Sequence, residues 1–281
     1  MGNTFTPETG FAAVEGGRLY YEVAGTGPAL VLVHAGVADC RMWDEQFEVF
    51  AARYRAIRYD TRGFGKTTSE DVSFSNRQDI VDLLGHLGVE RTAILGLSRG
   101  GQIAIDFTLE HPEMVTALIA VAAGVSGFES PPTEAEMALF TEYERLEKGK
   151  AYDELTDFEV RVWGDGPNQP TPRADVRVRE RLREMIANNY RLHHEELQPR
   201  VLEPPAVNRL GEIRVPTLVL WGDLDFSEVE KAMTFLTESI KGAQHVIFPG
   251  AAHMVNMEQP ERFNAVVLDF LAQSLATKGH S

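Results

Sequence analysis

A Gly-Leu-Ser-Arg-Gly sequence at residues 96–100 has the residue types and spacing of a nucleophile elbow, the G-x-S-x-G motif. In this motif a strand turns sharply into a helix and lifts a serine hydroxyl clear of the sheet, and the flanking glycines let strand and helix approach closely. An apolar run at 93–95 and a helix-like stretch at 102–110 supply that context here. Ser98 is therefore predicted to be a nucleophile; the alternative is an ordinary glycine-rich turn.

A serine hydroxyl needs a base within hydrogen-bond reach, and the base needs a third group to orient it. His253 comes just after an expected strand, and sites in parallel α/β sheets gather at the carboxyl ends of strands. Of the other histidines after Ser98, His111 lies at a helix end, and His193 and His194 lie in a polar helical stretch. His245 begins a strand, and His280 lies in the terminal tail. By elimination, His253 is the predicted base.

Two aspartates compete for the place of the third group. The expected strand 217–221 runs into Gly222, Asp223, Leu224 and Asp225, which puts both carboxylates at the carboxyl edge of the sheet. A buried carboxylate there would hold one tautomer of the imidazole and stabilise the imidazolium without taking the proton. The spacing alone does not choose between them.

A tetrahedral intermediate at Ser98 also needs backbone N–H donors for its oxyanion. One is expected from Arg99, the residue after the nucleophile. The other should come from the loop after the strand 29–33, where Gly36 lets the chain approach closely and Val37 is the second choice. Removing one such donor typically costs on the order of 3 kcal/mol of transition-state stabilisation.

The elements that must position these residues follow from the hydrophobic pattern. Apolar runs of strand length, as expected of strands covered on both faces, occur at 29–33, 56–59, 93–95, 118–122, 217–221 and 245–248. Gly16-Gly17 predicts an N-terminal hairpin, capping boxes predict helix starts at Ser75 and Ser227, and Pro260 predicts the start of the last helix. Strands alternating with helices predict an α/β fold with a mostly parallel, doubly wound sheet.

The alternation stops between residues 126 and 208. This stretch is polar, charged and helix-like, with proline-rich joints, and its expected helices are 134–148, 152–163 and 176–192. The strand pattern then resumes, so the same sheet continues beyond it. We therefore expect one core formed by residues 1–125 and 209–281, carrying a helical cap at 126–208.

Composition narrows the class of protein further. A formal charge of −15 disfavours a nucleic-acid or anionic-membrane partner, and 43% apolar with 25% charged residues is ordinary for a globular protein. A single cysteine, Cys40, excludes an intramolecular disulfide. The N-terminal residues lack the pattern of a signal peptide, no apolar run approaches the length of a bilayer span, and no metal-ligand spacing is present. A cytoplasmic protein without metal or organic cofactor is expected.

These residues together resemble the α/β-hydrolase fold family, in particular its capped, esterase-like and enol-lactonase-like members. The resemblance runs from about residue 11 to 275 and is loose only in the cap. It implies that Asp225 is the acid, that His34 is a structural histidine of the loop, and that the turn 60–65 shapes the floor of the site. Alanine at position 35 replaces a glycine of the family pattern, which leaves the second oxyanion donor less defined.

The resemblance implies acyl transfer to water, with a small to medium carboxylic ester or lactone as substrate. Related lactonases, enol-lactonases and carbon–carbon bond hydrolases use the same machinery, and some receptors on this scaffold bind a ligand without turnover. A serine nucleophile disfavours the haloalkane dehalogenases and epoxide hydrolases, which use aspartate. The sequence does not indicate an oligomeric state.

Two further side chains could contact substrate. Arg99 could hold a substrate carboxylate bidentately, although a guanidinium folded onto a nearby carboxylate or into solvent is the alternative. Among the three tryptophans, which more often pack in a core, Trp163 has the best claim to face the pocket because it lies in the cap.

Overall fold

The computed structural model describes residues 6–193 and 197–276, and within them the strands form one nine-stranded sheet. The strands are β1 Glu8–Val14, β2 Gly17–Ala24, β3 Ala29–Val33, β4 Arg55–Tyr59, β5 Thr68–Ser69, β6 Thr92–Leu97, β7 Val115–Val121, β8 Thr217–Gly222 and β9 Gln244–Phe248. Their order is β1-β2-β4-β3-β6-β7-β8-β9, with β5 paired to β2. In this spatial order, every neighbouring pair from β4 through β3 to β9 is parallel. The pairs β1 with β2 and β2 with β4 are antiparallel. The predicted fold class is confirmed.

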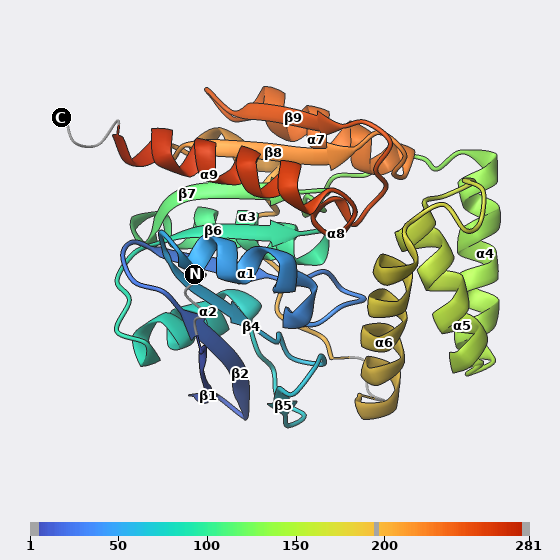
Figure 1. The fold of residues 1–281 in the computed structure, drawn as a ribbon, viewed down its shortest axis with the longest axis horizontal. Coiled ribbons are helices and arrows are strands. Elements are labelled where there is room, and N and C mark those ends of the chain that lie inside the picture. Colours follow the sequence, from blue (N-terminus) through green and yellow to red (C-terminus); the bar gives the residue numbers. More distant parts are fainter. Residues whose placement is uncertain (1–5, 194–196, 277–281) are drawn as a thin grey trace.

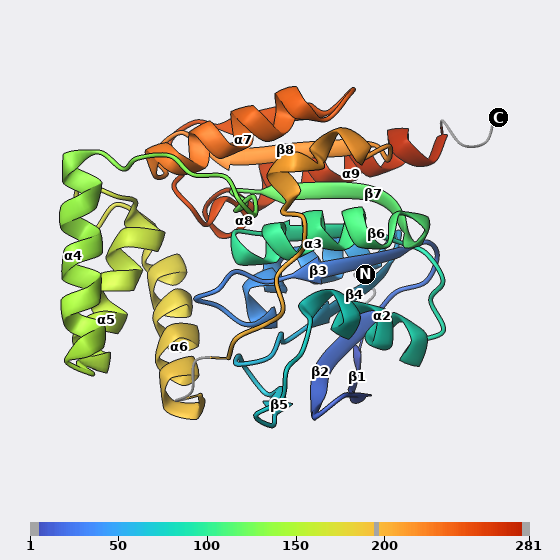
Figure 2. The ribbon, with the colours of Figure 1, turned by 180° about the vertical axis from the view of Figure 1, so that it is seen from behind.

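Helices cover both faces of this sheet (Figures 1 and 2). One face carries α1 Asp44–Ala51, α8 Val255–Glu258 and α9 Pro260–Ala276, and the other carries α2 Asn76–His86, α3 Arg99–Glu110 and α7 Ser227–Ser239. Successive side chains of a strand point to opposite faces. In β3, Val31 and Val33 therefore join the core under α2, α3 and α7, while Leu30 and Leu32 join the core under α1 and α9.

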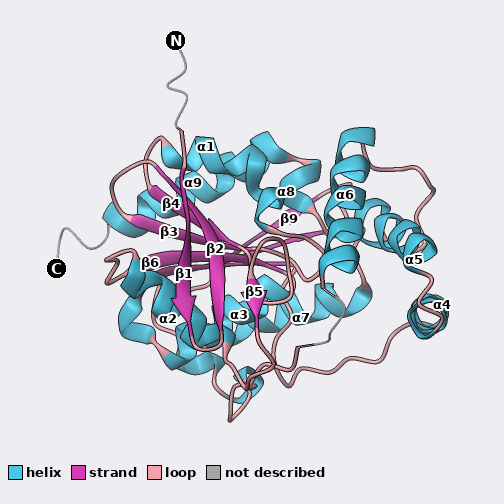
Figure 3. Ribbon diagram, turned by 90° about the horizontal axis from the view of Figure 1, so that it is seen from below, coloured by secondary structure: helices cyan, strands magenta, loops and turns pink. Residues whose placement is uncertain are grey.

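The helices between β7 and β8 lie together beyond the carboxyl ends of the parallel strands (Figures 1 and 3). They are α4 Glu134–Lys148, α5 Tyr152–Glu159 and α6 Val176–Leu192, and α5 continues into a π-helical segment, Val160–Asp165. The insertion therefore covers the sheet edge at which Ser98 and His253 were expected. None of the helices in the described ranges combines the length and the apolar character needed to cross a bilayer.

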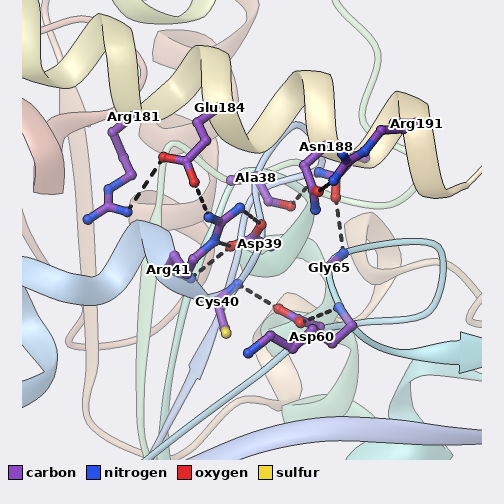
Figure 4. A network of polar contacts seen from close by, with 12 residues as sticks. Ala38, Asp39, Cys40, Arg41, Asp60, Gly65, Arg181, Glu184, Asn188 and Arg191 are labelled. Carbon is purple, nitrogen blue, oxygen red and sulfur yellow. Dashed lines mark hydrogen bonds and ion pairs between the residues drawn. The ribbon is translucent and has the colours of Figure 1, made fainter.

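Hydrogen bonds and an ion pair connect the inserted helices to the core. Asn189 on α6 donates to the Ala38 carbonyl at 3.1 Å and accepts from the Gly65 N–H at 3.0 Å. Nearby, Arg41 of the core pairs with Glu184 of α6 (Figure 4). These contacts tie α6 to the loops that follow β3 and β4, the two loops that border the expected site.

The two connections between the insertion and the core run side by side. The Ser126 hydroxyl accepts from the Ala206 N–H at 2.8 Å, and the Ser126 carbonyl accepts from the Val207 N–H at 3.0 Å. This pairing supports residues 126 and 208 as the ends of a cap unit, which stays a prediction.

The two predicted capping boxes do not form in full, although α2 begins directly after Ser75 and α7 begins at Ser227. Ser75 accepts from the Gln78 N–H, but the Gln78 side chain donates to Asp82, so only half of the capping box forms. Ser227 does not cap α7: its N–H and hydroxyl both donate to Glu136 of α4. A partner from a distant segment takes the place of the local cap, and a full capping box forms at Thr133 and Glu136 instead.

Candidate active site

Ser98 lies at the bend between β6 and α3 with φ 57° and ψ −120°, a left-handed backbone conformation that side chains rarely adopt. The close approach of its surroundings requires the two glycines of the motif. A Cβ on Gly96 would lie 2.1 Å from the Gly100 carbonyl oxygen, and one on Gly100 would lie 2.3 Å from that of Val33. The Ser98 N–H donates to the Val121 carbonyl at 2.8 Å, which fixes the bend to the neighbouring strand.

His253 and Asp225 are joined directly. His253 Nδ1–H donates to Asp225 Oδ2 at 2.7 Å, and the two side chains are 4% and 1% exposed. The second oxygen of Asp225 accepts from the Phe226 N–H at 2.8 Å, so both carboxylate oxygens are engaged. Asp223 instead accepts from the Gly250 N–H in an exposed turn. Of the two aspartates that the sequence leaves open, Asp225 is the one that contacts the imidazole.

A cavity of about 440 Å³ lies between the core and the inserted helices. Its core side includes Ser98, His253, Gly36 and Val37. Its helical side includes Trp163, Ile186, Asn189, Tyr190 and His193. The volume falls within the usual range for sites that bind small molecules.

Ser98 and His253 both line this cavity, and within the described ranges Ser98 Oγ and His253 Nε2 are not hydrogen-bonded to each other. Because Nδ1 donates to Asp225, Nε2 is the nitrogen that can accept a proton. A hydrogen bond of this type is often long before substrate binds and shortens in the complex.

The expected oxyanion donors lie against each other. Arg99 begins α3, so its N–H has no partner within the helix. Gly36, in the loop after β3, lies next to the Arg99 side chain: a Cβ there would be 3.4 Å from Arg99 Cδ. Val37 also lines the cavity. The loop after β3 and the start of α3 are therefore neighbours at the elbow that carries Ser98.

His34 holds this loop in place and does not line the cavity. The ring is fully buried, donates from Nδ1 to the Ala35 carbonyl at 2.7 Å and accepts at Nε2 from the Thr61 N–H at 3.0 Å. Burial lowers the pKa of His34 to about 4, so the ring is neutral at physiological pH. The neutral ring links the loops after β3 and β4, the structural role that the family resemblance implies.

The Arg99 guanidinium turns away from the cavity. It donates to the Thr61 hydroxyl at 2.8 Å and to Asn76 Oδ1 at 3.5 Å, and it lies over the Phe64 ring at 5.0 Å. Loss of hydration lowers its pKa to about 10. The guanidinium therefore donates to a hydroxyl and an amide oxygen of the described residues rather than to a carboxylate, and it does not line the cavity.

Trp163 lies in the π-helical segment and packs on the catalytic candidate His253, with ring centroids 4.7 Å apart. The predicted helix 152–163 does not continue as a regular α-helix, and π-helical turns are frequent at functional sites. The other two tryptophans, Trp43 and Trp221, are buried in the core.

One residue that the sequence analysis missed, Glu159, lines the cavity and is 4% exposed. Its carboxylate accepts from the Tyr190 hydroxyl at 2.9 Å, and burial raises its pKa to about 7. The signal was present in the sequence: Leu155, Phe158 and Val162 form an apolar stripe of a helix, and Glu159 lies on that stripe.

Within the described residues, one group has the composition of a metal site: Asp39, Cys40 and Asp60. Its carboxylates already accept hydrogen bonds from the protein. Asp60 accepts from the Cys40 N–H and the Lys66 N–H, and Asp39 pairs with Arg41 (Figure 4). This group fixes the turn beneath the site.

The chain belongs to the alpha/beta hydrolase family, whose sequence model matches residues 30–266. Among curated proteins, it is 30% identical to a 2-hydroxy-6-oxononadienedioate/2-hydroxy-6-oxononatrienedioate hydrolase of Paraburkholderia phymatum, over 92% of this chain and 94% of the relative. It is 29% identical to a 2-hydroxy-6-oxo-6-phenylhexa-2,4-dienoate hydrolase of Burkholderia cepacia, over 91% of each chain.

Solved structures show the same fold. A thermophilic esterase from Thermogutta terrifontis aligns with a TM-score of 0.74 and 25% identity, over 95% of this chain and 99% of that one. An enol-lactonase from Burkholderia xenovorans aligns with a TM-score of 0.73 and 22% identity, over 94% of this chain and 100% of that one. These likenesses establish a hydrolase of this family and leave its substrate open.

Proposed function

We propose that the protein is a serine hydrolase that cleaves small to medium carboxylic esters through an acyl-enzyme intermediate. The observation that carries the proposal is the Asp225–His253 hydrogen bond of 2.7 Å beside a cavity that Ser98 also lines. A hydroxyl held at a nucleophile elbow, next to an imidazole with its tautomer fixed by a buried carboxylate, is the arrangement that activates serine.

In the proposed reaction, Ser98 Oγ attacks the ester carbonyl carbon while His253 Nε2 takes the hydroxyl proton. The N–H groups of Arg99 and Gly36 stabilise the oxyanion of the tetrahedral intermediate. His253 then delivers the proton to the leaving alkoxide, and the acyl group stays on Ser98. A water that gives its proton to His253 attacks the acyl-enzyme and releases the acid. Asp225 stabilises the imidazolium in both halves.

Carbon–carbon bond cleavage in an oxo-dienoate is the second candidate, because the curated relatives are named for substrates of that class. Lactone opening is a third use of the same groups. All three reactions include attack at a carbonyl carbon, so the residues around Ser98 do not separate them.

A panel of substrates tests the proposal. It contains p-nitrophenyl esters of rising acyl length, a lactone, an enol-lactone and a 2-hydroxy-6-oxo-dienoate, each measured with wild type and Ser98→Ala. We expect steady turnover of the shorter esters that Ser98→Ala lacks. Turnover of the dienoate alone would favour the second candidate. Labelling by a fluorophosphonate without steady turnover of any substrate would favour a ligand receptor, and labelling of another residue would refute the assignment.

A further inference from the structure

The helical side of the cavity carries carboxylates and phenols from three helices. Glu159 ends α5, Tyr190 lies on α6, and Tyr143 and Glu147 lie on α4; all four line the cavity. Tyr190 donates to Glu159 Oε2 at 2.9 Å, and Tyr143 donates to Glu147 Oε1 at 3.2 Å. The two tyrosine hydroxyls also contact each other, so the four side chains form one network.

Glu159 is the buried member of this network, at 4% exposure, whereas Glu147 lies at the exposed end. Oε1 of Glu159 accepts no hydrogen bond from the described residues, and it is not among the fully enclosed polar atoms that lack a partner. This oxygen is therefore open to the cavity that the side chain lines, where a ligand that donates a hydrogen bond can reach it.

The charges around the cavity point to the same kind of ligand. Among its described lining residues there is no lysine or arginine, while Glu147 and Glu159 supply two carboxylates. The Arg99 guanidinium, which could have offset them, faces Thr61 and Asn76 instead. A carboxylate on a bound molecule would therefore meet like charge without a lysine or arginine to compensate it.

We propose that Glu159 is a specificity-determining residue of the cavity, and that it selects substrates whose bound end carries a hydrogen-bond donor, a hydroxyl or an ammonium, over substrates whose end carries a carboxylate. The inference rests on the proposed ester hydrolysis at Ser98. Tyr190 positions the Glu159 carboxylate, whose Oε1 accepts from the donor. Dicarboxylates, the class named for one curated relative, do not fit this cavity.

A matched set of p-nitrophenyl hexanoates whose last carbon carries hydrogen, hydroxyl, ammonium or carboxylate tests the selection. In wild type we expect kcat/KM for the hydroxyl and ammonium esters to exceed that of the unsubstituted ester by about tenfold, and the carboxylate ester to be the poorest. Glu159→Gln should remove the advantage of the ammonium ester and improve the carboxylate ester by about tenfold, mainly through KM. Glu154→Gln, an exposed glutamate of the same helix, should leave the order unchanged.

The pH dependence separates the two donor classes. The ammonium advantage should grow as the pH rises through about 7, where Glu159 loses its proton. The hydroxyl advantage should change little, because a hydroxyl donates to either form. The other titratable groups that line the cavity with Glu159 are Glu147 and Tyr143 from α4, Tyr190 and His193 from α6, and His253 of the core.

Binding of the same esters to Ser98→Ala, measured by calorimetry, tests the selection without turnover. If wild type turns over no ester but Ser98→Ala binds them in the expected order, the selection stands and the proposed reaction fails. If the order of the four esters is the same in wild type and Glu159→Gln, or if wild type prefers the carboxylate ester, the selection is wrong. Tyr190→Phe should weaken the preference partly, and labelling of Glu159→Gln by a fluorophosphonate checks its fold.

Discussion

At the scale of single residues, two aspartates that are two positions apart after β8 differ in what they contact. Asp225 accepts from His253 and is buried, whereas Asp223 accepts from the Gly250 N–H in an exposed turn. Asp225→Asn should lower kcat for p-nitrophenyl butyrate by about 10⁴-fold, because the amide favours the wrong tautomer of the imidazole. Asp223→Asn, the matched control, should keep kcat close to wild type. Equal losses in the two variants would contradict the proposed role of Asp225.

Arg99 supplies a second prediction at this scale. Its backbone N–H, at the first position of α3, is a proposed oxyanion donor, but its guanidinium donates to Thr61 and Asn76. Arg99→Met keeps the N–H and removes the guanidinium. We therefore expect KM to change by the same factor for a neutral ester and for the ester of a dicarboxylic acid. A selective rise in KM for the carboxylate-bearing ester would show that the guanidinium reaches the substrate.

The residues around Ser98 illustrate what sequence alone can predict about a site. The elbow at Ser98 and the histidine at position 253 are predictable, because the chemistry requires a serine and a histidine just after the carboxyl ends of particular strands. The choice of Asp225 over Asp223 required the family resemblance, since both follow the same strand. The direction of the Arg99 side chain was not predictable, because it depends on Thr61 and Asn76, which are distant in sequence.

At the scale of elements, Glu136 joins α4 to α7. Its carboxylate accepts from the Thr133 N–H at 2.8 Å and from the Ser227 N–H at 2.6 Å, and from both hydroxyls. Burial alone would raise the pKa of Glu136, but these hydrogen bonds outweigh it and lower the pKa. A carboxyl whose pKa is lowered on folding stabilises the protein above its ordinary pKa, and this contribution is lost as the pH falls.

Glu136→Gln should therefore lower the free energy of unfolding at pH 7 by about 1–3 kcal/mol, since an amide offers one acceptor oxygen where the carboxylate offers two. The difference from wild type should shrink as the pH falls below the ordinary value of 4.5. Urea denaturation at several pH values measures it. Glu134→Gln, on the exposed first turn of the same helix, is the control, and an equal loss there would rule out a specific contact with α7.

The bounds of a helix were predictable where the residues that determine them lie within the helix or next to it. The expected ranges 134–148 and 176–192 coincide with α4 and α6, because their caps and apolar stripes lie within the segment. The helix α7 begins at Ser227 as expected, but the capping box predicted there does not form, because a glutamate from another helix takes the hydrogen bonds of Ser227. The change from α5 to a π-helical turn has no local signal that we recognise.

At the scale of the whole molecule, the alternation of strands and helices was enough to predict the sheet, because buried parallel strands have a distinctive composition. How the inserted helices sit on the core was not predictable. It depends on single contacts such as Asn189 with the loops after β3 and β4, and His193 with the Gly65 carbonyl. The same contacts bring Glu159 and Tyr190 to the cavity. The side chains that would select a substrate therefore reach the cavity through the packing of the inserted helices on the core.

Asp106 on α3 lies where both connections to the inserted helices meet the core. The Ser126 hydroxyl donates to Asp106 Oδ1 at 3.0 Å and accepts from the Ala206 N–H. Burial raises the pKa of Asp106 from its ordinary value of 3.8 to about 6, despite the attraction of Arg77 and Arg209. The folded protein therefore holds this proton more tightly than the unfolded chain does, and the free energy of unfolding should fall as the pH rises from about 4 to about 6.

Asp106→Asn removes this buried charge and keeps an oxygen that can accept from Ser126. At pH 7 the variant should be more stable than wild type by up to about 3 kcal/mol, which is the full pKa shift converted to free energy and already includes the attraction of Arg77 and Arg209. Near pH 4 the advantage should vanish, because Asp106 is then protonated in the folded protein. Thermal melting across this pH range measures the difference. Asp153→Asn, at an exposed position on α5, is the control and should show no such trend. If Asp106→Asn changes the stability by the same amount at pH 4 and at pH 7, the charge of Asp106 is not the cause of the change.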